Sequence, residues 1–299
     1  MIMKIGFVND FYSEERVALA SKLGFDTMEI MVDYEHNLDI DQMTLEDIRA
    51  LKATFDKYGV SIGTVCTSLN LLDGDLEKRA RNIDYMTRMI HLVHEFGTNI
   101  ITTNVWGNTE VSPGDNIAIF KEVYTPIAAL CEEKGVKIAF ENCPHFLHYP
   151  MIIGNIGFSP EIWELMFEAV PSRALGLEFD PSHLYWLGID YVEALKKFAD
   201  RVYAFHAKDT EILRDKKNKY GILGKQFGKT SIWDYGWWRY RIPGWGEINW
   251  QEIYKVLFDS KYEGHIFIEH EDPVFDGDLR PQGLKMGIDY LRKLDIPVL

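Results

Sequence analysis

The sequence predicts an α/β fold, a closed (β/α)₈ TIM barrel that forms a single domain over residues 1–299. Its 299 residues match the length of one complete barrel. Helical patterns that end in glycine, each followed at once by an apolar run, recur about every 35 to 38 residues, roughly one strand–helix unit. Most of these runs are continuously apolar, as in a parallel sheet that is covered on both faces.

Four glycines end the predicted helices of the first half of the chain. These residues are Gly24, Gly59, Gly97 and Gly135. Glycine adopts the left-handed backbone conformation that closes a helix at little cost. We therefore expect a helix to end at each of them and a strand to begin directly afterwards.

Eight strands and eight helices alternate along the chain. The predicted strands cover 4–8, 26–32, 60–66, 99–105, 136–142, 174–180, 202–207 and 265–270. The predicted helices lie near 13–23, 44–58, 77–96, 117–134, 159–169, 190–199, 250–259 and 281–293. Pro126 should kink its helix, whereas Ser159 and Pro160 suit the start of the next one.

The alternative fold is a doubly wound open sheet. Such a sheet usually carries a glycine-rich phosphate loop after its first strand. Here that position reads Phe-Val-Asn-Asp-Phe, so the barrel is preferred. We find no linker that would divide the chain into two domains.

The connection at 210–249 is unusually long for a compact domain. It contains four tryptophans, Trp233, Trp237, Trp238 and Trp245, which argue against disorder. We interpret it as a lid over the barrel mouth or as an interface with a partner subunit, rather than as a passive surface excursion.

Composition excludes several classes of protein. A formal net charge of −14 argues against nucleic-acid binding, and the short basic run at 214–219 reads as a solvated loop. No stretch approaches the roughly 18 apolar residues of a membrane span. Three cysteines without paired spacing, and no signal peptide, predict a cytoplasmic protein with reduced thiols.

Four consecutive predicted strands end in an ionisable residue. These residues are Glu141, Asp180, His206 and Glu269. The carboxyl ends of barrel strands meet at one mouth, where active sites lie. Three carboxylates held together repel one another unless a cation is present, so the pattern predicts one divalent metal ion. Oxygen ligands with a single imidazole suit Mn²⁺, Mg²⁺ or Co²⁺.

The sequence resembles the xylose-isomerase-like TIM barrels, the sugar phosphate isomerase/epimerase family, over nearly its whole length. The segments that carry the resemblance are Phe-Glu-Asn at 140–142, Phe-Asp-Pro-Ser-His at 179–183, Phe-His-Ala-Lys-Asp-Thr at 205–210, Arg-Ile-Pro-Gly-Trp-Gly-Glu-Ile-Asn-Trp at 241–250 and Ile-Glu-His at 268–270. The resemblance implies that Glu141, Asp180, His206 and Glu269 bind one catalytic metal, commonly Mn²⁺.

The resemblance also implies roles for neighbouring residues. In that family the two glutamates double as acid/base groups, and the histidine matching His183 lies beside the metal and helps to hold substrate. An arginine near the Pro-Gly segment often contacts substrate, so Arg239 and Arg241 are both candidates. The family also contains nucleases, but these need several zinc ions and more histidines than this site offers.

Further polar and aromatic residues are candidates for catalysis or substrate binding. His145 lies four residues beyond Glu141 and could act as an additional base, or simply face water. Lys208 could stabilise an oxyanion or a phosphate, or form a salt bridge with Asp209 or Glu211. Trp106 and Trp245 could stack on a sugar ring, although packing alone would also account for them.

The predicted site fits several reactions. A metal that chelates a carbonyl and the adjacent hydroxyl acidifies the neighbouring C–H, and a carboxylate can remove that proton. Return of the proton gives epimerisation or isomerisation, whereas loss of a β-substituent gives elimination. We favour an isomerase or epimerase acting on a sugar, whose phosphorylation the sequence does not reveal. The alternative is a lyase or dehydratase acting on a 3-keto sugar or glycoside.

Two other possibilities concern partners. Some members of the family cleave C-glycosides together with a smaller partner chain, so this chain could be the catalytic subunit of such a deglycosidase. By analogy with the family we otherwise expect a homo-oligomer. A barrel that only binds sugar is a third hypothesis, but four intact metal ligands argue against it.

Overall fold

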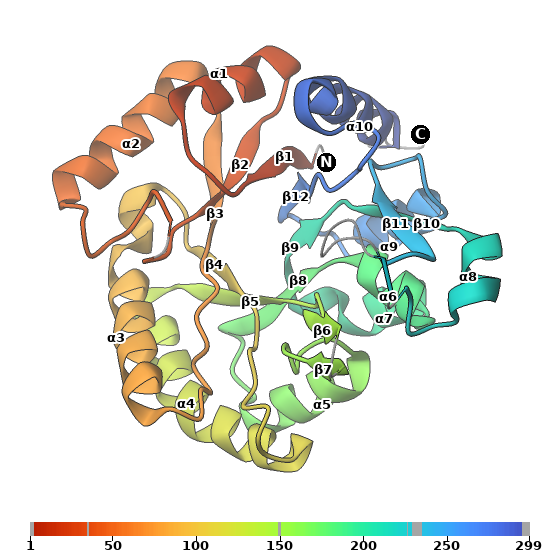
Figure 1. Cartoon of the computed structure of the whole chain (residues 1–299). Helices are drawn as coiled ribbons and strands as arrows, with labels where there is room; N and C mark the ends of the chain where they lie inside the picture. Colours follow the sequence, from red (N-terminus) through yellow and green to blue (C-terminus); the bar gives the residue numbers. More distant parts are fainter. Residues whose placement is uncertain (1–2, 35, 149–150, 226, 229–234, 295–299) are drawn as a thin grey trace.

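The structure, a computed structural model, describes residues 3–34, 36–148, 151–225, 227–228 and 235–294. Eight parallel strands close into a barrel in the order β1-β12-β9-β8-β5-β4-β3-β2, and helices lie around its outside (Figure 1). The predicted single-domain TIM barrel is therefore confirmed. The chain closes the barrel by pairing β1, its first strand, with β12, its last.

Every barrel strand overlaps a predicted one. The strands are β1 (Lys4–Asn9), β2 (Thr27–Met31), β3 (Ser61–Cys66), β4 (Ile100–Thr103), β5 (Lys137–Glu141), β8 (Leu175–Phe179), β9 (Val202–His206) and β12 (His265–Ile268). The helices that cover them are α1 (Glu14–Leu23), α2 (Leu45–Tyr58), α3 (Leu76–Leu92), α4 (Pro113–Lys134), α5 (Pro160–Ala169), α7 (Tyr191–Phe198), α9 (Trp250–Asp259) and α10 (Arg280–Leu294).

The glycine-terminated helices also form as predicted. Gly24, Gly59, Gly97 and Gly135 all adopt positive φ, between 67° and 91°. Each follows a helix, although the third helix closes with a 3₁₀ turn, η1 (Val93–Phe96). Local backbone chemistry therefore sets the rhythm of this half of the barrel.

Side chains of unequal size fill the barrel interior. Gly63 faces it, and a β-carbon there would lie 2.8 Å from Cζ of Phe267 and 2.6 Å from Oγ1 of Thr27. The large Phe267 ring thus occupies space that a larger residue on β3 would need. Toward the carboxyl ends of the strands the interior becomes polar, and this layer leads into the site.

Some elements were missed. A short helix, α6 (Pro181–Leu187), begins directly after Asp180, whose side chain accepts the backbone N–H of Ser182 at 2.7 Å. A small hairpin joins β6 (Phe146–His148) to β7 (Met151–Ile153). An N-cap Asp followed by Pro is a recognisable helix start, so α6 could have been predicted.

The connection over 210–249 has secondary structure of its own. The connection contains β10 (Asp209–Ile212), α8 (Arg214–Tyr220) and β11 (Trp238–Arg241), and β10 pairs antiparallel with β11. Buried Asp209 joins the start of this connection to its end, because it accepts hydrogen bonds from the backbone of Gly244 and Ile248 and from Nε1 of Trp250. We call residues 209–249 the excursion. Trp233 lies outside the described residues.

Two further findings bear on the sequence expectations. Within the described ranges, no helix has both the length and the apolar character that crossing a membrane requires. Cys66, Cys131 and Cys143 are free thiols.

Candidate metal centre and active site

The four predicted strand-end residues converge at one mouth of the barrel. Oε1 of Glu141 lies 3.5 Å from Nδ1 of His206, which in turn lies 3.2 Å from Oε2 of Glu269. Asp180 completes the group, since one atom each from Glu141, Asp180, Glu269 and His183 lies within 4.8 Å of all the others. The sequence had placed His183 beside the metal rather than on it.

The chemistry of these atoms fits a cation. Oε1 of Glu141, Oδ2 of Asp180, Nε2 of His183 and Nδ1 of His206 are buried and have no hydrogen-bond partner. His206 is outside the group of Glu141, Asp180, His183 and Glu269 and forms a second group with Glu29 and Glu178. Buried polar atoms are rarely left unsatisfied, and four of them in neighbouring side chains need an explanation. A divalent ion would satisfy them, and the carboxylate–imidazole set suits Mn²⁺, Mg²⁺ or Co²⁺.

Two buried carboxyl groups lie behind His206. Its Nε2 is 3.2 Å from Oε1 of Glu29 and 3.1 Å from Oε1 of Glu178. Oε2 of Glu29 also accepts hydrogen bonds from Thr64 at 2.6 Å and Thr102 at 2.9 Å. Burial opposes a charge on His206, but Glu178, Glu269 and Glu141 outweigh burial and raise its pKa well above the ordinary value. An acceptor at Nε2 favours a proton on that nitrogen, so a metal would bind at Nδ1 in place of the second proton.

These two carboxyl groups have opposite pKa shifts. Burial and the charge of Glu29 hold the pKa of Glu178 well above its ordinary value. Burial also opposes ionisation of Glu29, but its hydrogen bonds and the charge of His206 outweigh that effect and lower its pKa. Of the two, Glu29 therefore ionises more readily than Glu178.

An asparagine and a tyrosine hold Glu141 and His183 in place. Nδ2 of Asn104 donates to Oε2 of Glu141 at 2.8 Å, which leaves Oε1 directed at the histidines. The hydroxyl of Tyr240, on β11, lies 3.1 Å from Nδ1 of His183. The excursion therefore supplies a direct partner to a histidine of the site.

Lys208 lies within the site rather than at its edge. Its buried ammonium group bonds to Glu269, contacts Glu271 at 3.1 Å and lies 3.3 Å from Oδ2 of Asp180. The predicted alternative of a salt bridge to Asp209 or Glu211 is wrong, because the side chain turns toward β12. Burial raises the pKa of Glu269, but Lys208 and His206 more than reverse this and lower it to about 2.

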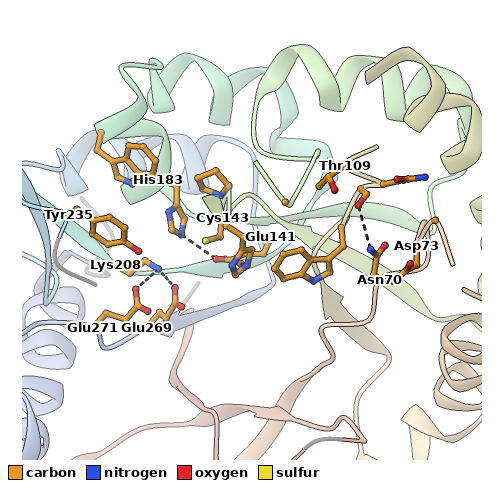
Figure 2. Close-up of a pocket in the computed structure, with 18 of the residues that line it drawn as sticks. Asn70, Asp73, Thr109, Glu141, Cys143, His183, Lys208, Tyr235, Glu269 and Glu271 are labelled. Carbon is orange, nitrogen blue, oxygen red and sulfur yellow. Dashed lines mark hydrogen bonds and ion pairs between the residues drawn. The ribbon is translucent and has the colours of Figure 1, made fainter. Parts of the chain in front are cut away.

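A cavity of about 680 Å³ opens above these groups. Figure 2 shows Lys208, Glu269, Glu271 and Tyr235 toward one end, Asn70, Asp73 and Thr109 toward the other, and Glu141 between them. The first end lies at the metal centre, and we call it the inner end. The second lies on the connections that follow β3 and β4, and we call it the outer end.

Comparison with known proteins places the chain in a family. The family model described as Xylose isomerase-like TIM barrel matches residues 17–294. The chain belongs to the xylose isomerase-like TIM barrels. A curated relative from Clostridium perfringens named inosose dehydratase is 26% identical over 248 residues, which cover 78% of this chain and 77% of the relative. Another inosose dehydratase, from Histophilus somni, is 27% identical and covers 97% of this chain and 92% of its own.

Solved structures share the fold of this xylose isomerase-like barrel. A D-psicose 3-epimerase in the presence of D-fructose superposes with a TM-score of 0.73 at 16% identity, covering 98% of this chain and 99% of its own. The IolI protein with a bound zinc atom gives a TM-score of 0.72 at 17% identity and 98% coverage of both chains. The inosose dehydratases and the D-psicose 3-epimerase are named for reactions on sugars and related polyols.

His145 and Trp106 lie beside the centre of this xylose isomerase-like site. Nε2 of His145 is 4.0 Å from Oε2 of Glu141 and is buried without a hydrogen-bond partner. The ring of Trp106 lies against the imidazole, tilted by 31° with centroids 4.5 Å apart, and its Nε1 donates to Ser68. Burial lowers the pKa of His145, so the ring is neutral near pH 7. A neutral imidazole can accept a proton.

Three sequence candidates for substrate binding do not line the cavity. Arg241 is buried and bonds to Asp272 and Glu211, and Arg239 also bonds to Glu211. Trp245 is 48% exposed and packs edge-on against Phe275. In this arrangement the arginines hold β11 in place, which is a different task from the predicted contact with substrate.

Several residues of the site were missed from the sequence. Glu29 and Glu178 each interrupt an apolar strand with one charge, a signal that could have been read as an inward-facing carboxylate. Glu271 lies two residues beyond Glu269 and so returns to the same side. Asn104 and Tyr240 carry no comparable sequence signal, because their role depends on how the barrel and the excursion are placed.

Proposed function

We propose that this chain is a divalent-metal-dependent isomerase or epimerase that acts on a sugar or sugar-like polyol. The observation that carries the proposal is the convergence of Glu141, Asp180, His183 and Glu269, each of which offers one atom within 4.8 Å of the others. Glu141, Asp180, His206 and Glu269 are the proposed ligands, and His183 the proposed substrate contact. The relatives named as epimerases and dehydratases support the same class of substrate.

The proposed chemistry is proton transfer. A bound divalent ion would polarise a carbonyl and acidify the neighbouring C–H. Glu141 and Glu269 are the proposed bases, since both carboxylates lie beside the proposed metal and their lowered pKa values keep them ionised at neutral pH. Lys208 holds the Glu269 carboxylate in place, and Asn104 holds that of Glu141. The protein thus supplies two positioned carboxylates on one small site.

A dehydratase is the second candidate, and two observations favour it. Several curated relatives are named inosose dehydratase. His145 also offers a neutral imidazole near Glu141, a group that could protonate a leaving hydroxyl after taking up a proton. Elimination would begin with the same proton removal, so the two candidates differ only in the fate of the resulting carbanion.

The excursion is the proposed lid or subunit contact. Tyr235 and Tyr240 line the cavity, so this segment reaches its mouth. A homo-oligomer in the cytoplasm, with or without a smaller partner chain, remains our expectation. The three free thiols are compatible with a reducing compartment.

The test is a product screen by NMR in D₂O with Mn²⁺-loaded protein. Epimerisation or isomerisation introduces deuterium next to the carbonyl, whereas dehydration produces an unsaturated ketone that absorbs in the ultraviolet. Glu141→Gln and Glu269→Gln should each lower turnover by on the order of 10²-fold, the usual contribution of a general base.

The matched control is Glu193→Gln, which removes a carboxylate from the exposed face of α7. It should leave turnover unchanged. Full activity in metal-free protein, or in the double glutamine variant with metal bound, contradicts the proposal.

A further inference from the structure

The charge of the cavity wall restricts what it can bind. Its lining contains six carboxylates, which are Asp73, Asp75, Glu110, Glu141, Glu269 and Glu271. Lys208 is the single lysine or arginine among the lining residues. A divalent ion and Lys208 together would offset only half of these negative charges, so the lining stays negative in the metal-loaded protein.

Lys208 is not available to a phosphate group. Its ammonium group is buried and already contacts Glu269, Glu271 and Asp180. A phosphate would have to displace at least one of these carboxylates and would then face the charge of the others.

Two nearby arginines already bind other groups of the protein. Arg79, close to the outer end in sequence, donates to the backbone carbonyls of Asp73 and Leu72. Arg241 is held by Glu211 and Asp272. Neither residue lines the cavity. The usual protein partners of a phosphate, arginine forks and free lysines, are thus missing from the described wall.

The outer end offers neutral partners instead. Asn70, Asn108 and Thr109 present amide and hydroxyl groups, and Trp106 presents an aromatic ring. Carboxylates, amides and an aromatic ring are suitable partners for the hydroxyl groups and the apolar faces of a polyol. At about 680 Å³, the cavity also lies within the size range of about 300–1,000 Å³ typical of pockets for drug-sized ligands.

We propose that this cavity selects uncharged polyhydroxylated substrates and rejects their phosphate esters, and that Asp73 and Glu110 enforce this selection at the outer end. The inference rests on the proposed sugar chemistry and narrows its substrate class. A substrate whose carbonyl lies at the inner end extends toward the outer end, so a phosphate on its far carbon meets these two carboxylates.

The test is calorimetric titration of Mn²⁺-loaded protein with D-fructose, D-fructose 1-phosphate and D-fructose 6-phosphate. The phosphate esters should bind at least roughly tenfold more weakly than the neutral sugar at low ionic strength, because like charges repel across the cavity. The difference should shrink at about 0.3 M salt, where screening shortens the range of this repulsion.

A charge-removal variant locates the effect. Asp73→Asn/Glu110→Gln keeps side chains of the same shape and removes two charges. It should lower the ratio of the dissociation constant of D-fructose 6-phosphate to that of D-fructose. The control Glu193→Gln/Asp289→Asn removes two charges from the exposed faces of α7 and α10 and should leave the ratio as it is in the wild type.

The outcomes separate this inference from the proposed function. Phosphate esters that bind as tightly as D-fructose overturn the inference. It is also overturned if the charge-removal variant leaves the ratio of the two dissociation constants unchanged, or if none of the three sugars binds. If D-fructose binds preferentially but no neutral sugar undergoes proton exchange in D₂O, the proposed chemistry fails and the inference stands.

Discussion

At the scale of single residues, the site contains two imidazoles that compete for one role. Both His206 and His183 direct a partnerless nitrogen toward Oε1 of Glu141, at 3.5 and 3.4 Å. The two histidines differ in the partner of their second ring nitrogen. His206 is backed by the buried carboxyl groups of Glu29 and Glu178, whereas His183 is backed by the hydroxyl of Tyr240. A metal-binding histidine is usually oriented by a carboxylate or a carbonyl, which favours His206 as the ligand.

The first prediction separates these two histidines. His206→Ala should lower the metal content of the purified protein well below one ion per chain. His183→Ala should retain the metal and lose turnover, because it removes the proposed substrate contact. Metal analysis by inductively coupled plasma mass spectrometry, together with turnover at saturating Mn²⁺, provides both readings. Retention of metal by the His206 variant and its loss from the His183 variant would exchange the two roles.

The second prediction concerns Glu29. Removal of a carboxylate behind a metal-binding histidine typically costs 10- to 100-fold in metal affinity, so Glu29→Leu should weaken Mn²⁺ binding by about that factor. Glu29→Gln retains an oxygen that can accept the Nε2 proton of His206 and should recover most of the affinity. Competition with a fluorescent chelator measures both variants. Equal weakening in the two variants would show that the hydrogen bond is not what positions His206.

At the scale of elements, the strands carry the positions of the ligands and also a buried histidine that links stability to pH. His265 is the first residue of β12, near the end of the barrel that lies away from the site. Burial, assisted by the charge of Lys4, lowers its pKa to about 4. The unfolded chain has the ordinary pKa of about 6.5, so it takes up a proton in this range that the folded chain does not.

The third prediction follows from that difference. Both states are neutral at His265 above about pH 6.5, and the free energy of unfolding should fall as pH drops from about 6.5 to about 4. His265→Gln should remove on the order of 1 kcal/mol of this fall, a discounted value because the side chain is partly exposed. Urea unfolding of both proteins at pH 7 and pH 4.5 tests it. A variant that loses as much stability as the wild type would contradict the assignment.

The elements also show how far the sequence could predict this molecule. Barrel strands and glycine-terminated helices depend on local patterns, and all eight strands were found. Asp209 shows the opposite case, because its partners Gly244, Ile248 and Trp250 lie 35 to 41 residues away and no local pattern connects them. The antiparallel pairing of β10 with β11 therefore could not be predicted from periodicity.

The residues of the site also fall into those that local sequence patterns could predict and those that they could not. The sequence could predict the proximity of Glu141, Asp180, His206 and Glu269, because parallel strands all end at one mouth of the barrel. The placement of Arg241 could not, since proximity in sequence to the Pro-Gly segment says nothing about its ion pair with Asp272. Charged residues inside apolar strands, such as Glu29 and Glu178, were visible and overlooked.

At the scale of the whole molecule, the excursion is the feature that departs most from a plain barrel. It leaves β9 after Lys208, forms its own small sheet outside the barrel and returns before α9 (Figure 1). Trp237, Trp238 and Tyr240 are buried together within it. Its far part differs, since Ile222 is 72% exposed and Phe227 is 90% exposed.

The fourth prediction concerns that far part. Exposed apolar side chains of this size are typical of contact surfaces, so we expect Ile222 and Phe227 to be covered in the assembled protein. Ile222→Asp/Phe227→Asp should lower the mass in solution below that of the wild type and leave thermal stability within a few degrees. Light scattering and thermal unfolding measure the two quantities. A wild type that is monomeric at assay concentrations would exclude the subunit contact and leave the lid as the remaining role.

The cavity also has a consequence for how this protein could acquire new substrates. Most of its inner end is built from side chains at or just beyond the tips of barrel strands, with Tyr235 added from the excursion, whereas its outer end lies on the connections after β3 and β4. Mutations in those connections can alter the recognition surface while the reactive groups stay where they are. The molecule thus keeps its chemistry and its selectivity on separate stretches of chain, so that one can drift under selection, or be exchanged by loop grafting, without rebuilding the other.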